Sequence, residues 1–235
     1  MAKVIILSGA GISAESGIST FRSEDGLWNN HRIEDVCMQG CLNTNREMTL
    51  NFYDDLRISL KDKEPNHAHK MVAKIKDKYP NDIAIITQNV DNLFEKGGCE
   101  DVIHLHGYLT QIYCEDCGYL EDIGYQKQED VYKTCPKCGK NKLRPNIVFF
   151  HEPAPMYEKL MEEFDNCEMF VVIGTSGYVI NTDRFLHPDI KISILNNLEP
   201  SLAIFDELYT KALFKPATEA IDEIVLDIEE FLKEQ

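Results

Sequence analysis

The sequence predicts an α/β fold: a doubly wound, mostly parallel sheet with a smaller domain of helices and a cysteine-rich segment. Short apolar runs alternate along the chain with helix-like stretches, which is the order of a βαβ fold. Two segments, 33–60 and 114–138, interrupt this alternation and account for the smaller domain. The chain of 235 residues, 43% of them hydrophobic, is long enough for a sizeable core.

Four apolar runs rich in β-branched residues are typical of strands that are buried on both faces of a parallel sheet. They cover residues 4–7, 83–87, 169–173 and 190–195. Helices are expected between them, among others over 67–77 and 156–165. In the last stretch, 217–233, apolar residues recur at helical spacing, which predicts a helix with one face packed on the sheet.

Each predicted strand is followed by polar or glycine residues. In an open parallel sheet, ligands bind outside the carboxyl ends of the strands. We therefore expect the site among the residues that follow the runs: Gly9, Ala10 and Gly11; Gln88, Asn89, Val90 and Asp91; Gly174, Thr175 and Ser176; and Asn196 and Asn197.

Composition limits the possible partners and locations. The formal charge of -16 opposes binding to nucleic acid and favours a basic partner such as a lysine-bearing peptide, although an acidic surface also serves solubility alone. The apolar run near the N-terminus is too short for a signal peptide or a membrane span. We expect a soluble, cytoplasmic protein without a membrane partner.

Two Cys-x-x-Cys pairs form the most specific motif. Cys114 and Cys117 precede Cys135 and Cys138, a spacing that brings four thiolates into the tetrahedron preferred by Zn²⁺. Four thiolates leave no coordination position for water, so this zinc is expected to be structural. A dithiol or redox pair is the alternative. The remaining cysteines, Cys37, Cys41, Cys99 and Cys167, are expected to be free thiols.

The turn after the first strand fits the G-x-G-x-x-G/A pattern, with Gly9, Gly11 and Ala14 at its small positions. Small residues there let a pyrophosphate approach the backbone near a helix N-terminus. Tight packing of the turn is the alternative. The chain then enters the polar segment 19–32 instead of a second strand with an acidic ribose ligand, so NAD would bind differently than in hydride-transfer dehydrogenases.

Two histidines, His104 and His106, end another apolar run. The period of two along a strand places both on one face. Neutral imidazole is the usual general base at about pH 7, and Asn89 and Asp91 lie nearby in the sequence. A structural, hydrogen-bonding histidine is the alternative reading.

Together these motifs resemble the sirtuin family along nearly the whole chain and in the family's order. Residues 9–22 are similar to the NAD-binding signature, with Ser19 where proline is usual; 87–93 resemble the second signature, 105–107 the catalytic histidine motif and 143–150 the acyl-lysine channel. We expect a Rossmann-like NAD-binding domain over 1–32, 72–107 and 146–235. A helical insertion, 33–71, and a zinc-binding insertion, 108–145, are expected to form the small domain.

The resemblance implies an NAD-dependent protein-lysine deacylase, which transfers the acyl group of an acyl-lysine protein or peptide to ADP-ribose and releases nicotinamide. It implies that His106 is the general base and that Asn89 orients the ribose and a water molecule. NAD and zinc are the expected cofactors. Expected NAD contacts are Gly9, Ala10, Gly11, Ser13, Phe21, Arg22, Gln88, Asn89, Asp91, Gly174, Thr175, Ser176 and Asn197, and Val148 and Phe150 are expected to line the channel.

Phe94, His104 and His151 depart from the family pattern, which usually has histidine, glutamate and glycine there; none removes a catalytic group. Sirtuins that remove succinyl or malonyl groups carry a tyrosine and an arginine three residues apart, whereas Tyr53 and Arg57 are four apart. Because positions i and i+4 share a helix face, this pair remains a candidate for binding the acyl carboxylate. Deacetylation is the preferred prediction, with desuccinylation or demalonylation as the alternative.

Two further functions stay open at this level. An NAD glycohydrolase or ADP-ribosyltransferase would cleave the same bond of NAD without an acylated substrate. A non-catalytic zinc-ribbon module would not need Asn89, Asp91 and His106, and the acidic segment between the cysteine pairs disfavours nucleic acid as its partner. The motifs do not fix the acyl preference, the physiological substrate or the oligomeric state.

Overall fold

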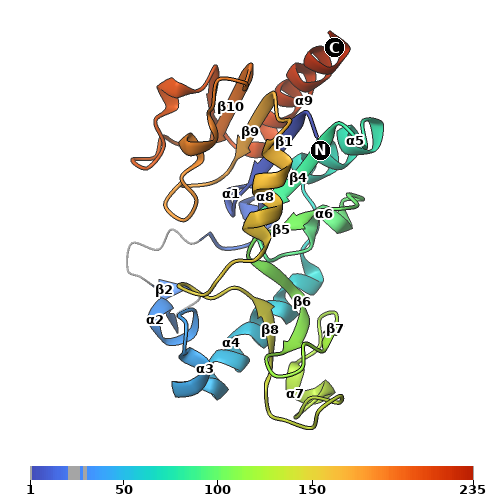
Figure 1. Cartoon of the computed structure of the whole chain (residues 1–235), viewed down its shortest axis with the longest axis vertical. Coiled ribbons are helices and arrows are strands. Elements are labelled where there is room, and N and C mark those ends of the chain that lie inside the picture. The colour runs from blue at the N-terminus through green and yellow to red at the C-terminus, as the bar shows by residue number, and fades with distance from the viewer. Residues whose placement is uncertain (1, 21–26, 29–30, 235) are drawn as a thin grey trace.

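The computed structural model describes residues 2–20, 27–28 and 31–234. Within this part of the chain, six strands form one parallel sheet in the order β11-β10-β9-β1-β4-β5 (Figure 1). They are β1 (Val4–Ser8), β4 (Ile83–Thr87), β5 (Ile103–His104), β9 (Met169–Ile173), β10 (Ile192–Asn197) and β11 (Lys211–Phe214). The predicted doubly wound α/β architecture is confirmed.

Both faces of the sheet are covered. Ile6 of β1 lies in an apolar cluster with α5 (His67–Lys78) and α9 (Ala217–Lys233). Its neighbour Leu7 points the other way, into a cluster with α8 (Met156–Phe164). Because both faces are buried, the strand sequences are continuous apolar runs and do not alternate with polar residues.

Helix α9 has the predicted bounds, and its regularly spaced apolar residues face the sheet as predicted. Ile221, Ile224 and Ile228 are completely buried, whereas Leu226 on the other side is 60% exposed. Full burial of an isoleucine side chain stabilises the fold by about 1.5–3 kcal/mol. The helix therefore closes one face of the sheet through a single apolar stripe.

The two segments that interrupt the alternation pack together below the large sheet (Figure 1). The first contains α2 (Ile33–Val36), α3 (Cys41–Thr44), α4 (Arg46–Ser59) and the 3-10 helix η1 (Leu60–Asp62). The second extends beyond the predicted 114–138 on both sides and contains an antiparallel sheet in the order β7-β6-β8. Its strands are β6 (Gly107–Cys114), β7 (Leu120–Asp122) and β8 (Leu143–Ile147), and it includes the helix α7 (Gln128–Val131).

An apolar cluster joins these two segments, since Phe52 and Tyr53 of α4 pack in it with Leu109 and Phe149. Helix α5 begins at His67, within the range 33–71 predicted for the helical insertion, but packs on the large sheet. The bounds of the two domains stay a prediction. The remaining elements are α1 (Gly11–Ala14), β2 (Leu27–Trp28), β3 (His31–Arg32), α6 (Leu93–Lys96), η2 (Thr182–Phe185) and η3 (Asp206–Leu208).

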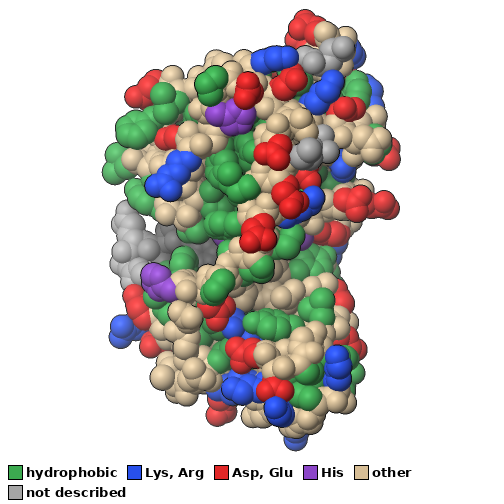
Figure 2. Space-filling view, viewed as in Figure 1, with side chains coloured by type: hydrophobic (Ala, Val, Ile, Leu, Met, Phe, Trp, Pro, Cys, Tyr) green, Lys and Arg blue, Asp and Glu red, His purple; other side chains and the backbone are tan. Residues whose placement is uncertain are grey.

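Acidic side chains occur along the whole length of the face shown in Figure 2 and are interspersed with lysine and arginine. This face has no continuous basic track of the kind that follows a nucleic-acid backbone. Among the described helices, none combines the length and the hydrophobicity that crossing a membrane requires.

Candidate functional site

The carboxyl ends of β1, β4 and β9 bring three predicted polar segments together. Gln88 donates through its backbone N–H to Ser8 O at 2.9 Å and through Nε2 to Thr175 Oγ1 at 3.0 Å. Asn89 donates through Nδ2 to Ser13 Oγ at 3.1 Å. Residues more than 70 positions apart thus meet at one edge of the sheet, as expected for parallel strands.

Close packing of backbone explains the glycines at this edge. The N–H of Gly11 donates to Gly174 O at 2.8 Å, and a Cβ on Gly11 would lie 2.6 Å from Gly174 Cα. A Cβ on Gly9 would lie 2.8 Å from Thr175 Cβ, and Gly174 itself has φ +67. The alternative reading of the G-x-G pattern, tight packing of the turn, therefore has a structural basis whether or not a pyrophosphate also lies there.

A buried polar network centres on Ser13. Its hydroxyl donates to Asp91 Oδ2 at 3.0 Å and lies 3.4 Å from His69 Nε2, and Asn89 donates to it. Burial raises the pKa of Asp91, although the Leu93 N–H and the Ser13 hydroxyl both donate to its carboxylate. Burial also lowers the pKa of His69 to about 4, so its ring is neutral at about pH 7.

His106 lies between β5 and β6 with both ring nitrogens engaged. Nδ1 is 3.0 Å from the backbone O of Gln88, and Nε2 is 3.0 Å from the Tyr157 hydroxyl. A carbonyl oxygen can only accept, so Nδ1 carries the proton and Nε2 of the neutral ring carries the lone pair. Burial lowers the pKa of His106, which favours this neutral form.

The strand argument for the two histidines was wrong in one respect. β5 ends at His104, so the period of two does not extend to His106, and the rings have different partners. His104 places Nδ1 3.0 Å from Asn89 O and Nε2 2.8 Å from Glu95 Oε1. It therefore holds the Asn89 backbone, next to the site, while His106 lies within it.

The predicted channel segment is anchored by a buried arginine. Arg144 pairs with Glu152 at 2.7 Å and lies 3.9 Å from the centre of the Phe149 ring, and Glu152 accepts the N–H of Phe149 at 2.9 Å. Val148 donates its N–H to His106 O at 2.9 Å. Since the same segment contacts the anchor and His106, Val148 is held beside the histidine.

Phe150 is half-buried against the cluster that joins the two small segments, and its backbone pairs with that of Cys37 and Gln39. His151 has φ +69, a conformation in which glycine is unstrained and histidine is among the better tolerated residues. This backbone angle is a physical reason for the glycine that is usual at this position in the family that the sequence resembles. It does not bring the imidazole of His151 to His106.

Asn197 has a buried side-chain donor without a partner at the same edge of the sheet. It is the last residue of β10, is 3% exposed, and its Nδ2 has no hydrogen-bond partner among the described residues. A buried amide without a partner costs about 1–3 kcal/mol, which a bound polar ligand would recover. Together with the glycine turns, this donor fits a nucleotide. The predicted contacts Phe21 and Arg22 lie outside the described residues.

The four predicted zinc ligands come together. Their sulfur atoms all lie within 4.8 Å of one another, with Cys114 Sγ 3.7 Å from Cys138 Sγ and Cys117 Sγ 3.6 Å from Cys135 Sγ. A tetrahedron with Zn–S bonds of about 2.3 Å has edges of about 3.8 Å, so the set fits zinc.

Each cysteine pair closes with a glycine at positive φ, Gly118 at +67 and Gly139 at +73. Their N–H groups donate to Cys114 O at 2.9 Å and to Cys135 O at 2.8 Å. The apolar cluster around the thiols is small. The metal is therefore expected to provide much of the stability of this segment.

The candidate carboxylate clamp of Tyr53 and Arg57 is not presented to a substrate in this structure. Arg57 is completely buried, forms an ion pair with Asp54, and donates through Nε to Leu109 O at 2.7 Å. Asp54 also accepts the N–H of Gln128 at 3.0 Å, so the pair ties α4 to β6 and α7. The ring of Tyr53 stacks on Phe149, 5.4 Å between centres.

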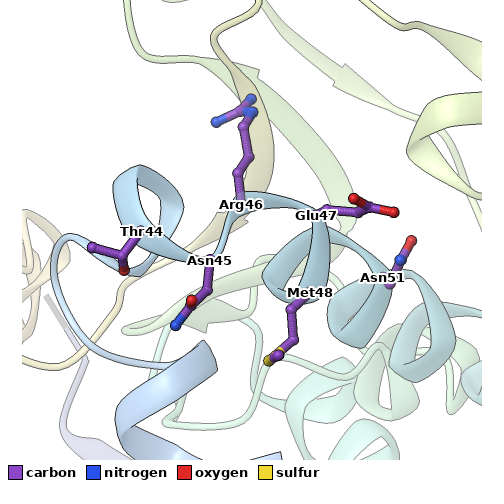
Figure 3. Close-up of a pocket in the computed structure, with 6 residues that line it drawn as sticks. All are labelled: Thr44, Asn45, Arg46, Glu47, Met48 and Asn51. Carbon is purple, nitrogen blue, oxygen red and sulfur yellow. The ribbon is translucent and has the colours of Figure 1, made fainter.

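A hollow of about 540 Å³ lies elsewhere, at the start of α4. Figure 3 shows Arg46 pointing away from Met48 and Asn51 there; its Nη2 donates to Leu143 O. None of its lining residues belongs to the network around Ser13 and His106, so it is not the candidate site. The lining residues are Thr44, Asn45, Arg46, Glu47, Met48 and Asn51.

Asn66, His69 and Tyr157 were not predicted as site residues. Asn66 caps α5, accepts from the backbone of Ala68, and donates through Nδ2 to Ile12 O at 2.8 Å, which brings the helix start under the glycine turn. An asparagine before an apolar-periodic segment was the available signal, since asparagine is a preferred N-cap. No sequence signal connects Tyr157 to His106.

Comparison with known proteins gives one consistent result. Residues 9–181 match the model of the Sir2 family. The chain is similar to an NAD-dependent protein deacylase of Campylobacter jejuni, 43% identical with 100% of this chain and 99% of the relative covered. A second NAD-dependent protein deacylase, of Helicobacter hepaticus, is 38% identical over 98% of this chain and 99% of the relative.

Solved structures are similar in fold over nearly the whole length. A Sir2 homolog–NAD complex is 31% identical with a TM-score of 0.84, covering 97% of this chain and 90% of that one. A mutant Sir2 homologue in complex with ADP ribose is 30% identical with a TM-score of 0.83, covering 99% and 94%. A Sir2–p53 peptide–NAD⁺ structure is 25% identical with a TM-score of 0.76, covering 95% and 92%.

Substituting Cys135→Ser should remove the metal and lower the melting temperature by about 10 °C or more. Structural zinc binds with apparent free energies of about 10–16 kcal/mol, and each lost kcal/mol lowers Tm by about 2–4 °C at this size. Metal content and thermal unfolding are measured on the same samples, with Cys99→Ser as the control that keeps its zinc. A metal-free variant of unchanged Tm would contradict the structural role.

Substituting Arg57→Met should destabilise the fold by about 3–5 kcal/mol, because it leaves the Asp54 carboxylate buried without its partner. Denaturant unfolding measures this, and Arg32→Met, at an exposed arginine, should change stability by less than about 0.5 kcal/mol. Unchanged stability combined with a selective loss of succinyl-peptide turnover would instead restore the carboxylate clamp.

Proposed function

The chain belongs to the Sir2 family, and from this premise we propose that His106 is the general base of an NAD-dependent deacylation of lysine side chains. The activity of this chain is NAD-dependent protein deacylation, that of relatives which match it over its full length. One observation carries the assignment of His106. Its neutral ring is oriented by the Gln88 carbonyl, and Nε2 keeps the lone pair that a base needs.

Bound NAD supplies the ADP-ribose that accepts the acyl group and nicotinamide as the leaving group. His106 would take a proton from a ribose hydroxyl onto Nε2, while Nδ1–H stays on Gln88 O. Holding Nδ1 in this way fixes both the tautomer and the plane of the ring, so the base need not reorient during the reaction.

The network around Ser13 supports the roles proposed for its members. Asn89 would orient the ribose and a water molecule, and Asp91 with Gln88 and Ser13 would hold the nicotinamide end. All lie at the edge formed by β1 and β4, and their mutual hydrogen bonds leave them few alternative rotamers. Such prior ordering reduces the entropy lost when a substrate is positioned.

At the other end of the nucleotide, Asn197 Nδ2 would donate to the adenosine part, with Gly9, Ala10 and Gly11 and the turn Gly174, Thr175 and Ser176 beside it. The unpaired amide and the absence of Cβ atoms on the glycines support this placement. Phe21 and Arg22 remain proposed NAD contacts on sequence grounds alone.

Val148 and Phe150 would line the apolar passage for the acyl-lysine stem. Both are half-buried, and both belong to the segment that Arg144 and Glu152 fix next to His106. The formal charge of -16 would attract the cationic surroundings of a substrate lysine from a distance. Proteins or peptides with acylated lysine are therefore the proposed substrates, and the cytoplasm, where zinc thiolates stay reduced, is the proposed location.

Acetyl is the proposed acyl group. Arg57 is completely buried and its Nη1 pairs with Asp54, so a succinyl carboxylate would reach it only after the residues that cover it move. No contact of the described residues favours a glycohydrolase over a deacylase. The difference between them is whether nicotinamide release requires an acylated lysine.

Incubation with NAD and acetyl-, succinyl- or unmodified-lysine peptides should release nicotinamide only with an acylated peptide, one equivalent per acyl group lost. His106→Ala should lower kcat by about 10²–10⁴-fold, the usual contribution of a general base, while NAD still binds. His67→Ala, at an exposed histidine paired with Asp222, is the control. Equal release with the unmodified peptide would mean a glycohydrolase, and substantial activity of His106→Ala would exclude the base assignment.

The pH dependence of kcat/KM for NAD should follow the ionisation of His106. The base acts only when neutral, so activity is full above its pKa and is lost as the pH falls through it. Because burial lowers this pKa from 6.5, the acid limb should lie below pH 6.5. An acid inflection above 6.5, in steady-state rates at constant ionic strength, would disprove the assignment.

A further inference from the structure

The lone pair of the proposed base has a partner of its own. Since Nδ1–H of His106 points at a carbonyl, Nε2 of the neutral ring can only accept, and the hydroxyl 3.0 Å away belongs to Tyr157. The Tyr157 O–H therefore donates to Nε2. This is the same nitrogen that must face a ribose hydroxyl during deacylation.

We propose that Tyr157 is a positioning residue. Its hydroxyl donates a hydrogen bond to Nε2 of His106 in the absence of NAD, and the ribose hydroxyl of NAD replaces it there. The proposal rests on the proposed role of His106 as the base. Only one lone pair is available on Nε2, so the tyrosine and the ribose cannot both donate to it. Tyr157 keeps its own proton throughout, because the ribose hydroxyl is the group that transfers a proton to Nε2.

The placement of Tyr157 suits this exchange. It is the second residue of α8, a helix whose first turn has no side-chain cap, and its ring is half-buried on the sheet face that α8 covers. The centres of the two rings are 6.0 Å apart at 42°, a tilted pair in which the hydroxyl makes the hydrogen bond. Burial raises the pKa of Tyr157, which keeps the hydroxyl protonated and a donor.

The channel segment links this contact to the acyl-lysine. Val148 donates to the backbone O of His106, and Tyr157, nine positions later, donates to its ring. The start of this segment is tightly held through Arg144 and Glu152. The segment proposed to hold the acyl-lysine therefore contacts His106 at two points, its backbone and its ring.

Replacing one neutral hydrogen bond by another is a competition of modest size. A net hydrogen bond of the usual strength corresponds to about a two- to tenfold change in an equilibrium constant. The Tyr157 hydroxyl should therefore weaken the binding of NAD by this factor. It should also shield Nε2 from small electrophiles in the absence of NAD.

The test compares Tyr157→Phe with Tyr209→Phe. Tyr209 lies in the same apolar cluster and also uses its hydroxyl, which donates to Thr182 Oγ1 at 2.7 Å, but it does not contact His106. Two quantities are measured without the peptide substrate: the Kd of NAD by calorimetry, and the rate at which diethyl pyrocarbonate modifies His106, followed by peptide mass. Steady-state kcat and KM with an acetyl-lysine peptide and the Tm of each variant complete the set.

Tyr157→Phe should lower the Kd and the KM for NAD about two- to tenfold and speed modification of His106 by a similar factor, without a fall in kcat. Tyr209→Phe should change none of these. A fall in kcat at unchanged KM would mean that Tyr157 relays protons, and weaker NAD binding with a lowered Tm would mean a merely structural residue; either result overturns the proposal.

Failure of the proposed function gives a different pattern. If His106 is not the base, His106→Ala retains activity in wild-type and Tyr157→Phe backgrounds, whereas the modification rate of His106 still reports whether Tyr157 covers its nitrogen. An unchanged modification rate in Tyr157→Phe overturns the positioning role even if the deacylase assignment stands.

Discussion

Backbone contact between two glycine turns sets the position of Ser13, on which the buried polar network of the site depends. The turn after β1 and the turn after β9 approach so closely that a single Cβ on Gly11 would lie 2.6 Å from Gly174. This contact joins the ends of the neighbouring strands β1 and β9. It also places Ser13, in the helix α1 that follows β1, near the residues after β4. The hydrogen bonds of Ser13 to Asn89 and Asp91 depend on that position.

Burying the polar groups of the site costs stability, which the rest of the fold offsets. Asp91, His69 and Asn89 are buried, and burial shifts the pKa of each ionisable group among them toward its neutral form. Their burial is tolerated because each is hydrogen-bonded to Ser13. The apolar clusters on both faces of the sheet stabilise the fold. The small segments have an apolar cluster of their own, and a buried ion pair at Arg57 and thiols that fit zinc add to it.

The segment from β8 to α8 connects the parts of the molecule. It leaves the antiparallel sheet, passes the Arg144–Glu152 pair, contacts His106 through Val148, and enters α8 beside Tyr157. A movement between the large sheet and the small segments would have to act on this stretch. This one stretch of chain thus contacts the proposed base and contains both the residues proposed to line the acyl-lysine passage and a strand of the antiparallel sheet.

The sequence predicts the central buried strands, the closing helix α9, the cysteine cluster and most of the residues at the edge of the sheet, but not β11 or the antiparallel sheet β7-β6-β8. Buried parallel strands are continuous apolar runs, α9 has one apolar stripe, and cysteine spacing is local, so each leaves a pattern that can be read along the chain. Only the tertiary structure decided the partners. Arg57 could face a substrate or Asp54 on spacing alone, and His69 and Tyr157 carry no local sign that they meet Ser13 and His106. Contacts between residues far apart in the sequence depend on how the layers pack, and the residues next to a side chain in the sequence do not show which distant residue it will contact.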